Sequence, residues 1–349
     1  MRLEPKPAPS LATTLLYPAG AVLATVVMSS LLVLTAGANP FAVFGLVLKG
    51  AAGSQFALVE TLTRATPLIF TGLAVAVAFR ARLWNIGAEA QLYAGAIVTV
   101  VLGTGALPLP SFVLIPVIVV FAALAGALVL LGPAVLKVRF GVDEVVTTLL
   151  LNFVMILFVS MLLEGVLKDP MGMGWPKSQG IIADAKLPRI VTGRRLHYGC
   201  VLAIACAVAV WIVMKKTALG YEMRAVGHNP EASRFAGMSV NLILIKTALL
   251  SGGLAALAGF SEVSGLKGSL TLDLSPGFGY TGIVVAMLAM LNPLGVVVAA
   301  IFVAGIFVGA DAMSRAAGVP SYIANVMVAT ALLTMVTAIM LTRFRLRWR

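Results

Sequence analysis

A short polar stretch, RARLWNIGAEAQ, begins at Arg80 and leads into an otherwise apolar run. Arg80 and Arg82 mark an edge, and Asn85, Glu89 and Gln91 then continue into the run. Polar groups in such a run usually face a bundle interior or a water-filled cavity, because exposing them to lipid is costly. A helix that begins near Asn85 would place Asn85 and Glu89 on one face. The stretch therefore indicates either hydrogen-bonding groups along a path for a polar solute or a capped helix start near an interface.

Asn152 is a further amide, and it lies in the middle of an apolar run. An amide that faces lipid is unfavourable, so we expect Asn152 to face the interior of the bundle. There it would either contact a solute or tie two helices together. Asn85, Glu89, Gln91 and Asn152 form the predicted pathway set.

The stretch GHNPEASRFAG, which begins at Gly227, has the pattern of a short capped helix. Asn229 is a good N-cap, Pro230 suits the first turn, Glu231 favours the positive end of the helix dipole, and Gly237 can end a helix. Because a helix of about seven residues is marginal alone in water, its caps favour a helix that packs against a partner; the alternative is a turn that only orders a loop. The predicted docking segment comprises Asn229, Pro230, Glu231, Ala232, Ser233, Arg234, Phe235, Ala236 and Gly237.

Other chemistry has little support in the sequence. The glycines of GFGYTG, residues 277–282, match G-x-G-x-x-G, but an apolar span follows in place of a βαβ unit, so they predict a tight turn or a close helix approach. The sequence contains no P-loop motif for ATP. His197 and His228 are far apart, and Cys200 and Cys206 lie in one apolar segment, so we predict no metal site and no resident cofactor. No catalytic arrangement of side chains is recognisable, and the chain is predicted not to be an enzyme.

The composition is that of a membrane protein. Of the 349 residues, 60% are hydrophobic and only 11% are charged, and the mean hydropathy is +1.05. A membrane-spanning helix needs about 20 mostly apolar residues, and the chain supplies that length many times. The net charge of +12 is therefore interpreted through membrane topology, not through binding of nucleic acid.

We predict an all-α integral membrane protein with about ten transmembrane helices in a single domain, residues 1–349. A short N-terminal tail (1–12), a loop (215–239) that holds the docking segment, and a basic C-terminal tail (342–349) complete the prediction. The predicted spans are 13–36, 65–79, 86–103, 111–131, 145–163, 198–214, 241–262, 280–291, 294–310 and 322–341. The first is longer than a signal-peptide core and is predicted to be retained. The second and eighth are short, as in segments that border a transport path.

The basic residues favour cytoplasmic termini, with the loop 215–239 on the same side. The loop 164–197 then lies outside, although it is itself rich in Lys and Arg, and we expect it to be irregular and exposed. FGVD at residues 140–143 and AGVP at 317–320 each precede a span that contains an asparagine. This echo weakly favours an inverted repeat.

Several segments resemble the permease subunits of bacterial ABC importers for nucleosides and simple sugars, within the branched-chain amino acid/ribose permease superfamily. They are NPFAVFGLVLKG, TPLIFTGLAVAVAFRARLWNIGAEAQLYAGA, FGVDEVVTTLLLNF, GYEMRAVGHNPEASRFAGMS and LSGGLAALAGFSEVSG. The resemblance extends from about residue 39 to residue 337. It is greatest for the longer permease of purine-nucleoside importers. Ala90 stands where the family commonly has glycine, and its methyl group leaves less room for close helix packing.

The resemblance implies a type II-like permease of the bacterial inner membrane that moves a nucleoside, with ATP and Mg²⁺ bound by separate ATPase subunits. It implies a second related permease and an extracytoplasmic binding lipoprotein as partners, besides membrane lipid. The segment 229–237 matches the family's coupling helix, which sits in a groove of the ATPase. A sugar or a nucleobase is the alternative substrate. An ion-coupled secondary transporter or channel is a further alternative, but it would need buried charged sites for the ion, and charges within the spans are scarce. A membrane scaffold without transport is another, and it would leave the polar stretch at Asn85 unexplained.

Overall fold

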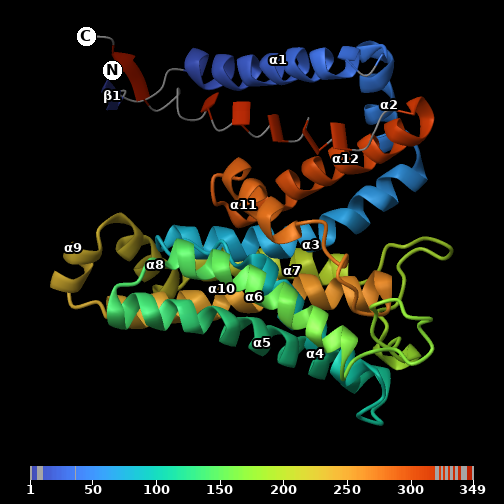
Figure 1. The fold of residues 1–349 in the computed structure, drawn as a ribbon. Helices are drawn as coiled ribbons and strands as arrows, with labels where there is room; N and C mark the ends of the chain where they lie inside the picture. The colour runs from blue at the N-terminus through green and yellow to red at the C-terminus, as the bar shows by residue number, and fades with distance from the viewer. Residues whose placement is uncertain are drawn as a thin grey trace. The chain divides into compact units, whose positions relative to one another are not determined.

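The computed structural model describes residues 2–5, 11–35 and 37–318, and nearer the C-terminus 322–323, 325–326, 329–330, 333–334, 337–338 and 344–347. The chain divides into two compact units (Figure 1). Unit 1 contains Met1–Thr61 and Phe302–Arg349, and unit 2 contains Leu62–Ile301. The prediction of one transmembrane domain stays a prediction, because a division by compactness does not test it.

In unit 1 a sharp break separates the first two helices of the chain. They are α1 (Leu11–Thr35) and α2 (Pro40–Ala52). The chain bends by 112° between the second part of α1, Leu23–Thr35, and α2. Asn39 caps α2, because its side chain accepts from the N–H of Phe41 at 3.0 Å. The sequence prediction missed α2, although the Asn-Pro pair that begins it is the same signal that predicted the helix at Asn229. The strands β1 (Arg2–Pro5) and β2 (Phe344–Arg347) pair antiparallel.

Unit 2 is a bundle of helices, and it includes most of α3 (Gln55–Arg80) and the first part of α12 (Pro293–Ala317). The remaining elements are α4 (Ala88–Gly103), α5 (Ser111–Phe140), α6 (Glu144–Glu164), the 3₁₀ turn η1 (Ala183–Ala185), α7 (Gly199–Lys216), α8 (Ala218–His228), α9 (Pro230–Phe235), α10 (Val240–Glu262), the π turn η2 (Val263–Lys267) and α11 (Phe278–Leu288).

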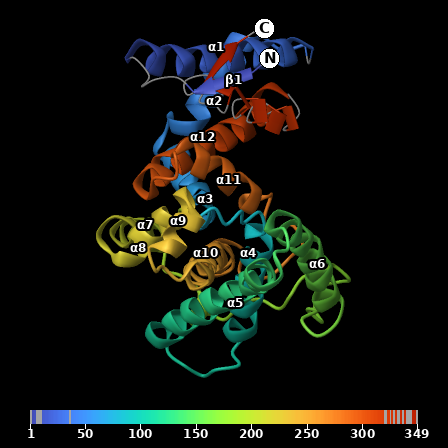
Figure 2. The same ribbon diagram turned by 90° about the vertical axis from the view of Figure 1, so that its left-hand side faces the viewer.

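Small residues let α10 approach α4 and α5 closely, and the three helices lie together in Figure 2. A Cβ on Gly252 of α10 would lie 2.3 Å from the carbonyl oxygen of Gly126 in α5. A Cβ on Gly259 would lie 1.9 Å from the carbonyl oxygen of Leu92 in α4. Between apolar helices in lipid, such backbone contact replaces the hydrophobic driving force that is available in water.

The long connection from 165 to 198 is irregular, as predicted, but it is not simply exposed. It covers the end of α4 and the turn η2, which follows α10, through backbone hydrogen bonds, including Ile182 N–H to Gly103 O (2.8 Å) and Leu187 N–H to Ser264 O (2.8 Å). His197 is fully buried at its end. Burial lowers the pKa of His197 to about 4, so the ring is neutral at pH 7.

Among the residues that the structure describes, six helices have the length and hydropathy to cross a membrane, namely α3, α5, α6, α7, α10 and α12, and the bent pair α1–α2 brings the number to seven. α4 and α11 are apolar but shorter. The predicted number of ten is therefore not confirmed, and the predicted tenth span, 322–341, is described only in part. The loop predicted at 215–239 contains two helices, α8 and α9. The sequence signal for α8 was the helical spacing of its buried residues Gly220, Met223, Val226 and Gly227.

The contact between Gly126 and Gly252 can be tested with two glycine substitutions in α5, one at the contact and one away from it. Gly126→Ala should lower the free energy of unfolding by about 1–3 kcal/mol, because the new methyl would overlap the Gly252 carbonyl. Gly132→Ala is the matched control, since its new methyl would meet no other element of the described chain within 4 Å and alanine favours a helix. Thermal unfolding of the purified chain in detergent measures both. Equal stability of the two variants would contradict this packing.

Candidate functional site

The connection between α3 and α4, residues 81–87, is a non-helical linker in which Ala81, Leu83, Asn85 and Gly87 are buried. Arg82 adopts a left-handed backbone with φ of 55°. The ring of Trp84 packs edge-on against Phe79, with centroids 4.6 Å apart. Lys137 of α5 donates to the carbonyl oxygen of Arg82 at 3.3 Å and pairs with the carboxylate of Glu144. The N–H groups of Ala81, Arg82, Leu83 and Asn85 donate to nearby backbone carbonyls. Those of Trp84, Ile86 and Gly87 need side chains as partners.

A stripe of polar residues at four-residue spacing on α6 meets this need, and it consists of Glu144, Thr148 and Asn152. The carboxylate of Glu144 accepts from the N–H of Trp84 at 3.3 Å. The hydroxyl of Thr148 accepts from the N–H of Ile86 at 3.2 Å. All three stripe residues are buried, so one face of α6 supplies partners along the linker.

Of the three stripe side chains, Asn152 makes the most hydrogen bonds to other elements. Its Nδ2 group donates to the carbonyl oxygen of Ile86 at 2.9 Å and to the hydroxyl of Tyr280 at 3.0 Å. Its Oδ1 atom accepts from the N–H of Ala90 in the first turn of α4 at 2.9 Å. Asn152 is fully buried, and it therefore joins α6 to the start of α4 and to α11.

Asn85 uses its full hydrogen-bonding capacity within the protein. Its Nδ2 group donates to Gln91 Oε1 (2.9 Å) and to Ser251 Oγ (3.0 Å). Its Oδ1 atom accepts from Gln91 Nε2 (2.8 Å) and from the N–H of Gly87 (3.0 Å). Ser251 in turn donates to the carbonyl oxygen of Ala74 at 2.7 Å. The side chain thus connects the linker, α4, α10 and α3, and none of its polar atoms is left for a solute.

Glu89 connects two short helices. It lies in the first turn of α4, and its Oε2 atom accepts from the N–H of Gly279 in the first turn of α11 at 2.6 Å. The residue is 3% exposed. A carboxylate in this position is stabilised by the N-terminal N–H groups and the dipoles of the helices. Glu89 therefore holds the starts of α4 and α11 together.

The glycines of the 277–282 motif serve a turn and close contacts, as the sequence predicts. Gly277 has φ of 90° just before α11. A Cβ on Gly279 would lie 2.3 Å from the backbone nitrogen of Glu89, and one on Gly282 would lie 2.6 Å from the hydroxyl of Thr71. These positions therefore require glycine for steric reasons.

The structure brings the four predicted pathway residues into one region, and all four are buried and hydrogen-bonded. We name the side chains that satisfy the linker the linker network: Asn85, Gln91, Glu144, Thr148, Asn152 and Ser251. Sequence reasoning missed Glu144, Thr148 and Ser251 as parts of this region. The four-residue spacing of Glu144, Thr148 and Asn152 was a readable signal, whereas the contact of Ser251 with Asn85 joins residues far apart in the chain.

The predicted docking segment forms α9, with six helical residues. Asn229 is the N-cap, and its Oδ1 atom accepts from the N–H groups of Glu231 and Ala232, each at 3.0 Å. The C-cap is Ala236, and Gly237 follows with φ of 83°. The capping residues predicted from the sequence are thus confirmed, while the helix is one residue shorter than expected.

α9 presents most of its residues to the surroundings. Within the helix only Ser233 is buried, and its hydroxyl donates to the carbonyl oxygen of Asn229 at 2.8 Å. Phe235 is 97% exposed, which is unusual for an aromatic side chain beside polar residues. α8 leads into α9, and it contacts the end of α3 closely, because a Cβ on Gly227 would lie 2.0 Å from the carbonyl oxygen of Arg80. The segment is in Figure 1 at the end of unit 2 opposite the 165–198 connection.

Apolar helices of spanning length around a buried polar region define a multi-pass membrane protein. The chain belongs to the branched-chain amino acid transport system / permease component family, whose profile matches residues 57–342. It is therefore a permease subunit of an ABC transporter. Among the residues that the structure describes, no group of three or more His, Cys, Asp and Glu side chains could hold a metal ion.

Three relatives are similar over most of their length. The glucose ABC transporter permease protein TsgB13 of Haloferax volcanii is 35% identical over 334 residues, which cover 93% of this chain and 87% of that protein. The guanosine ABC transporter permease protein NupP of Bacillus subtilis is 35% identical over 326 residues, with 91% and 92% covered. The nucleoside ABC transporter permease protein NupB of Lactococcus lactis is 30% identical over 322 residues, with 90% and 88% covered. No solved structure matches the chain significantly.

The linker network can be tested through Asn85. Asn85→Ala leaves at least two buried polar partners without a hydrogen bond, and each such group costs about 1–3 kcal/mol. We expect a loss of several kcal/mol in the free energy of unfolding, measured by thermal unfolding in detergent. The control Asn39→Ala removes the cap of an exposed helix start and should cost only about 1 kcal/mol. An Asn85→Ala variant as stable as the control would refute the structural role of Asn85.

Proposed function

We propose that this chain is a permease subunit of an ATP-driven importer that moves nucleosides, with purine nucleosides as the first candidates. The observation that carries the proposal is the similarity to NupP, which extends over more than nine-tenths of both chains and whose name specifies guanosine. NupB, named for nucleosides, adds to it at 30% identity. A nucleoside has both ribose hydroxyls and polar base edges, which need hydrogen-bond partners whenever they leave water.

A simple sugar is the second candidate substrate. TsgB13 is named for glucose, and its identity to this chain equals that of NupP. A sugar shares with a nucleoside the hydroxyl groups that a weakly polar path must accommodate, so the two candidates are separated by transport measurements and not by the class of fold.

We propose that Asn85, Glu89, Gln91 and Asn152 support the wall of the transport path. Because their hydrogen bonds are made within the protein, Asn85 and Gln91 would act by positioning the linker. Glu89 and Asn152 would act through α11. The hydroxyl of Tyr280 accepts a hydrogen bond from Asn152, and the Tyr280 side chain is 39% exposed. Tyr280 therefore connects these buried residues to the surface of the bundle. Its hydroxyl is our candidate for contact with the solute.

We propose that α9 couples the permease to a separate ATPase subunit, which binds ATP and Mg²⁺. Its exposed residues, its internal caps and the exposure of Phe235 support this role. A capped helix keeps its shape while a partner presses against it, and α8 would transmit the movement to the end of α3. With this division of roles the chain itself binds no nucleotide.

The proposed arrangement in the inner membrane has about ten spans, with both termini and α9 cytoplasmic. Six long helices, the bent pair, the two shorter apolar helices α4 and α11, and the predicted span 322–341 make up this number. Gly141 and Gly318 end α5 and α12 with φ of 68° and 63°, which supports the type II-like inverted repeat. A second related permease and an extracytoplasmic binding lipoprotein complete the proposed importer.

Uptake by the complete importer tests the proposal. Reconstituted with its ATPase, the wild-type protein should accumulate radiolabelled guanosine only with ATP, and unlabelled nucleosides should compete while glucose should not. Phe235→Asp should reduce uptake more than tenfold, because an unpaired charge in a packed contact costs about 2 kcal/mol or more. Met173→Asp, at an equally exposed apolar side chain in the 165–198 connection, is the control and should transport normally.

ATP-dependent uptake of radiolabelled glucose, with no uptake of radiolabelled guanosine, would assign the sugar as substrate. Normal uptake by the Phe235→Asp importer would remove α9 from the coupling role, whatever the substrate.

A further inference from the structure

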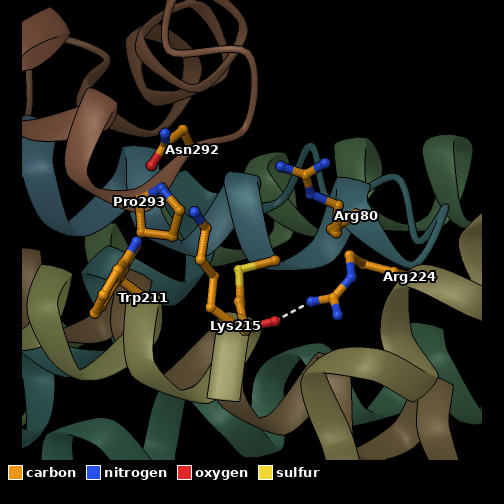
Figure 3. A pocket seen from close by; sticks show the side chains of 7 residues that line it. Arg80, Trp211, Lys215, Arg224, Asn292 and Pro293 are labelled. Atoms are coloured by element: carbon orange, nitrogen blue, oxygen red, sulfur yellow. Dashed lines mark hydrogen bonds between the residues drawn. The ribbon is translucent and has the colours of Figure 1, made fainter. Parts of the chain in front are cut away.

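A cavity of about 370 Å³ lies where α3 and α7 end, beside the middle of α8 and the connection from α11 to α12. Three cationic side chains border it, and each comes from a different helix: Arg80 from α3, Lys215 from α7 and Arg224 from α8 (Figure 3). Trp211, Asn292 and Pro293 complete this part of the wall. The cavity is distinct from the linker network, since none of its lining residues belongs to that network.

The positive charges of this cavity are not balanced by the protein. No carboxylate lines it, and none of the three cations pairs with one among the residues that the structure describes. Arg80 donates through Nη2 to the carbonyl oxygen of Leu291 at 3.0 Å, while its Nε atom is buried without a partner. Arg224 donates to the carbonyl oxygen of Met214. The ammonium of Lys215 lies 5.7 Å from the ring centroid of Trp211, a distance at which the two can attract each other.

This arrangement is suited to an anion. Three like charges around a partly enclosed space repel one another more strongly than in open water, because the local dielectric constant is lower. A bound anion removes this repulsion, and guanidinium groups with a lysine ammonium are the usual partners of phosphate oxygens. The amide of Asn292 adds a neutral hydrogen-bonding group, and Trp211 and Pro293 add apolar surface beside the charges.

The position along the helices indicates where the anion comes from. α3 and α7 both have the length and hydropathy of membrane spans, and Arg80 and Lys215 lie in their last turns. Residues at the ends of such helices lie at the level of the lipid headgroups. A cavity there meets both the aqueous phase and the phosphates of the adjacent leaflet, and basic pockets between membrane helices are suited to anionic headgroups.

We propose that this cavity binds a phosphate group, supplied by the headgroup of an anionic phospholipid. The lipid would neutralise Arg80, Lys215 and Arg224 and so stabilise the junction of α3, α7 and α8. The inference depends on the placement of these helices in a membrane and not on the substrate of the transporter.

The test uses the full-length chain in neutral detergent and measures the thermal unfolding midpoint during separate titrations with phosphatidylglycerol, phosphatidylcholine and inorganic phosphate. The informative variants are Lys215→Gln and Lys215→Glu. Arg80 and Arg224 are unsuitable, because their guanidinium groups also donate to backbone carbonyls and so hold the fold together. The matched control is Lys216→Glu, the neighbouring exposed lysine that does not line the cavity.

Phosphatidylglycerol should raise the unfolding midpoint of the wild-type chain, and phosphatidylcholine should raise it less. The half-maximal lipid concentration should increase about fivefold in Lys215→Gln and about 30-fold in Lys215→Glu. The first variant removes one positive charge and the second also adds a negative one, and each unit of charge changes the affinity about fivefold. Lys216→Glu should resemble the wild type. Stabilisation by inorganic phosphate that Lys215→Glu loses would also support the phosphate site, with a free anion as its ligand. Equal stabilisation by both lipids, or equal effects at Lys215 and Lys216, would overturn the proposal.

Discussion

The structure depends on satisfying the backbone of a partly buried, non-helical linker in an apolar bundle. Residues 81–87 turn the chain from α3 into α4, and Ala81, Leu83, Asn85 and Gly87 are buried there, whereas Arg82 and Trp84 are exposed. In such surroundings each unsatisfied backbone group costs several kcal/mol. The stripe Glu144, Thr148 and Asn152 on α6, together with Asn85, supplies the missing partners. This requirement explains why amides and hydroxyls occur inside helices that are otherwise mostly apolar.

The same residues fix the relative positions of helices that are far apart in sequence. Asn85 links α4 to Ser251 of α10, and Asn152 links α6 to Tyr280 of α11. Glu89 joins the starts of α4 and α11. Glycines then allow α10 to contact α4 and α5 at backbone distance. Hydrogen bonds thus set which helices are neighbours, and small residues set how closely they approach.

Part of the fold and of the buried polar region could be predicted from short-range patterns in the sequence. The membrane class follows from apolar length, and the caps of α9 follow from Asn229, Pro230 and Gly237, because capping acts within a few residues. The grouping of Asn85, Glu89, Gln91 and Asn152 was also anticipated, since buried amides must face the interior. Their partners were not, because Ser251 lies 166 residues from Asn85 and Gly279 lies 190 residues from Glu89. α2 was missed although Asn39 and Pro40 signal its start, and α8 was missed because it is too short and too polar for a span.

Site-specific photocrosslinking tests most directly whether the exposed face of α9 contacts a separate ATPase subunit, as proposed. A photoreactive phenylalanine analogue at position 235, in an importer that still transports, should crosslink to the ATPase in high yield. The same analogue at position 173, equally exposed in the 165–198 connection, should give no ATPase adduct. Absence of the adduct at position 235, or equal yields at both positions, would contradict the coupling role of α9.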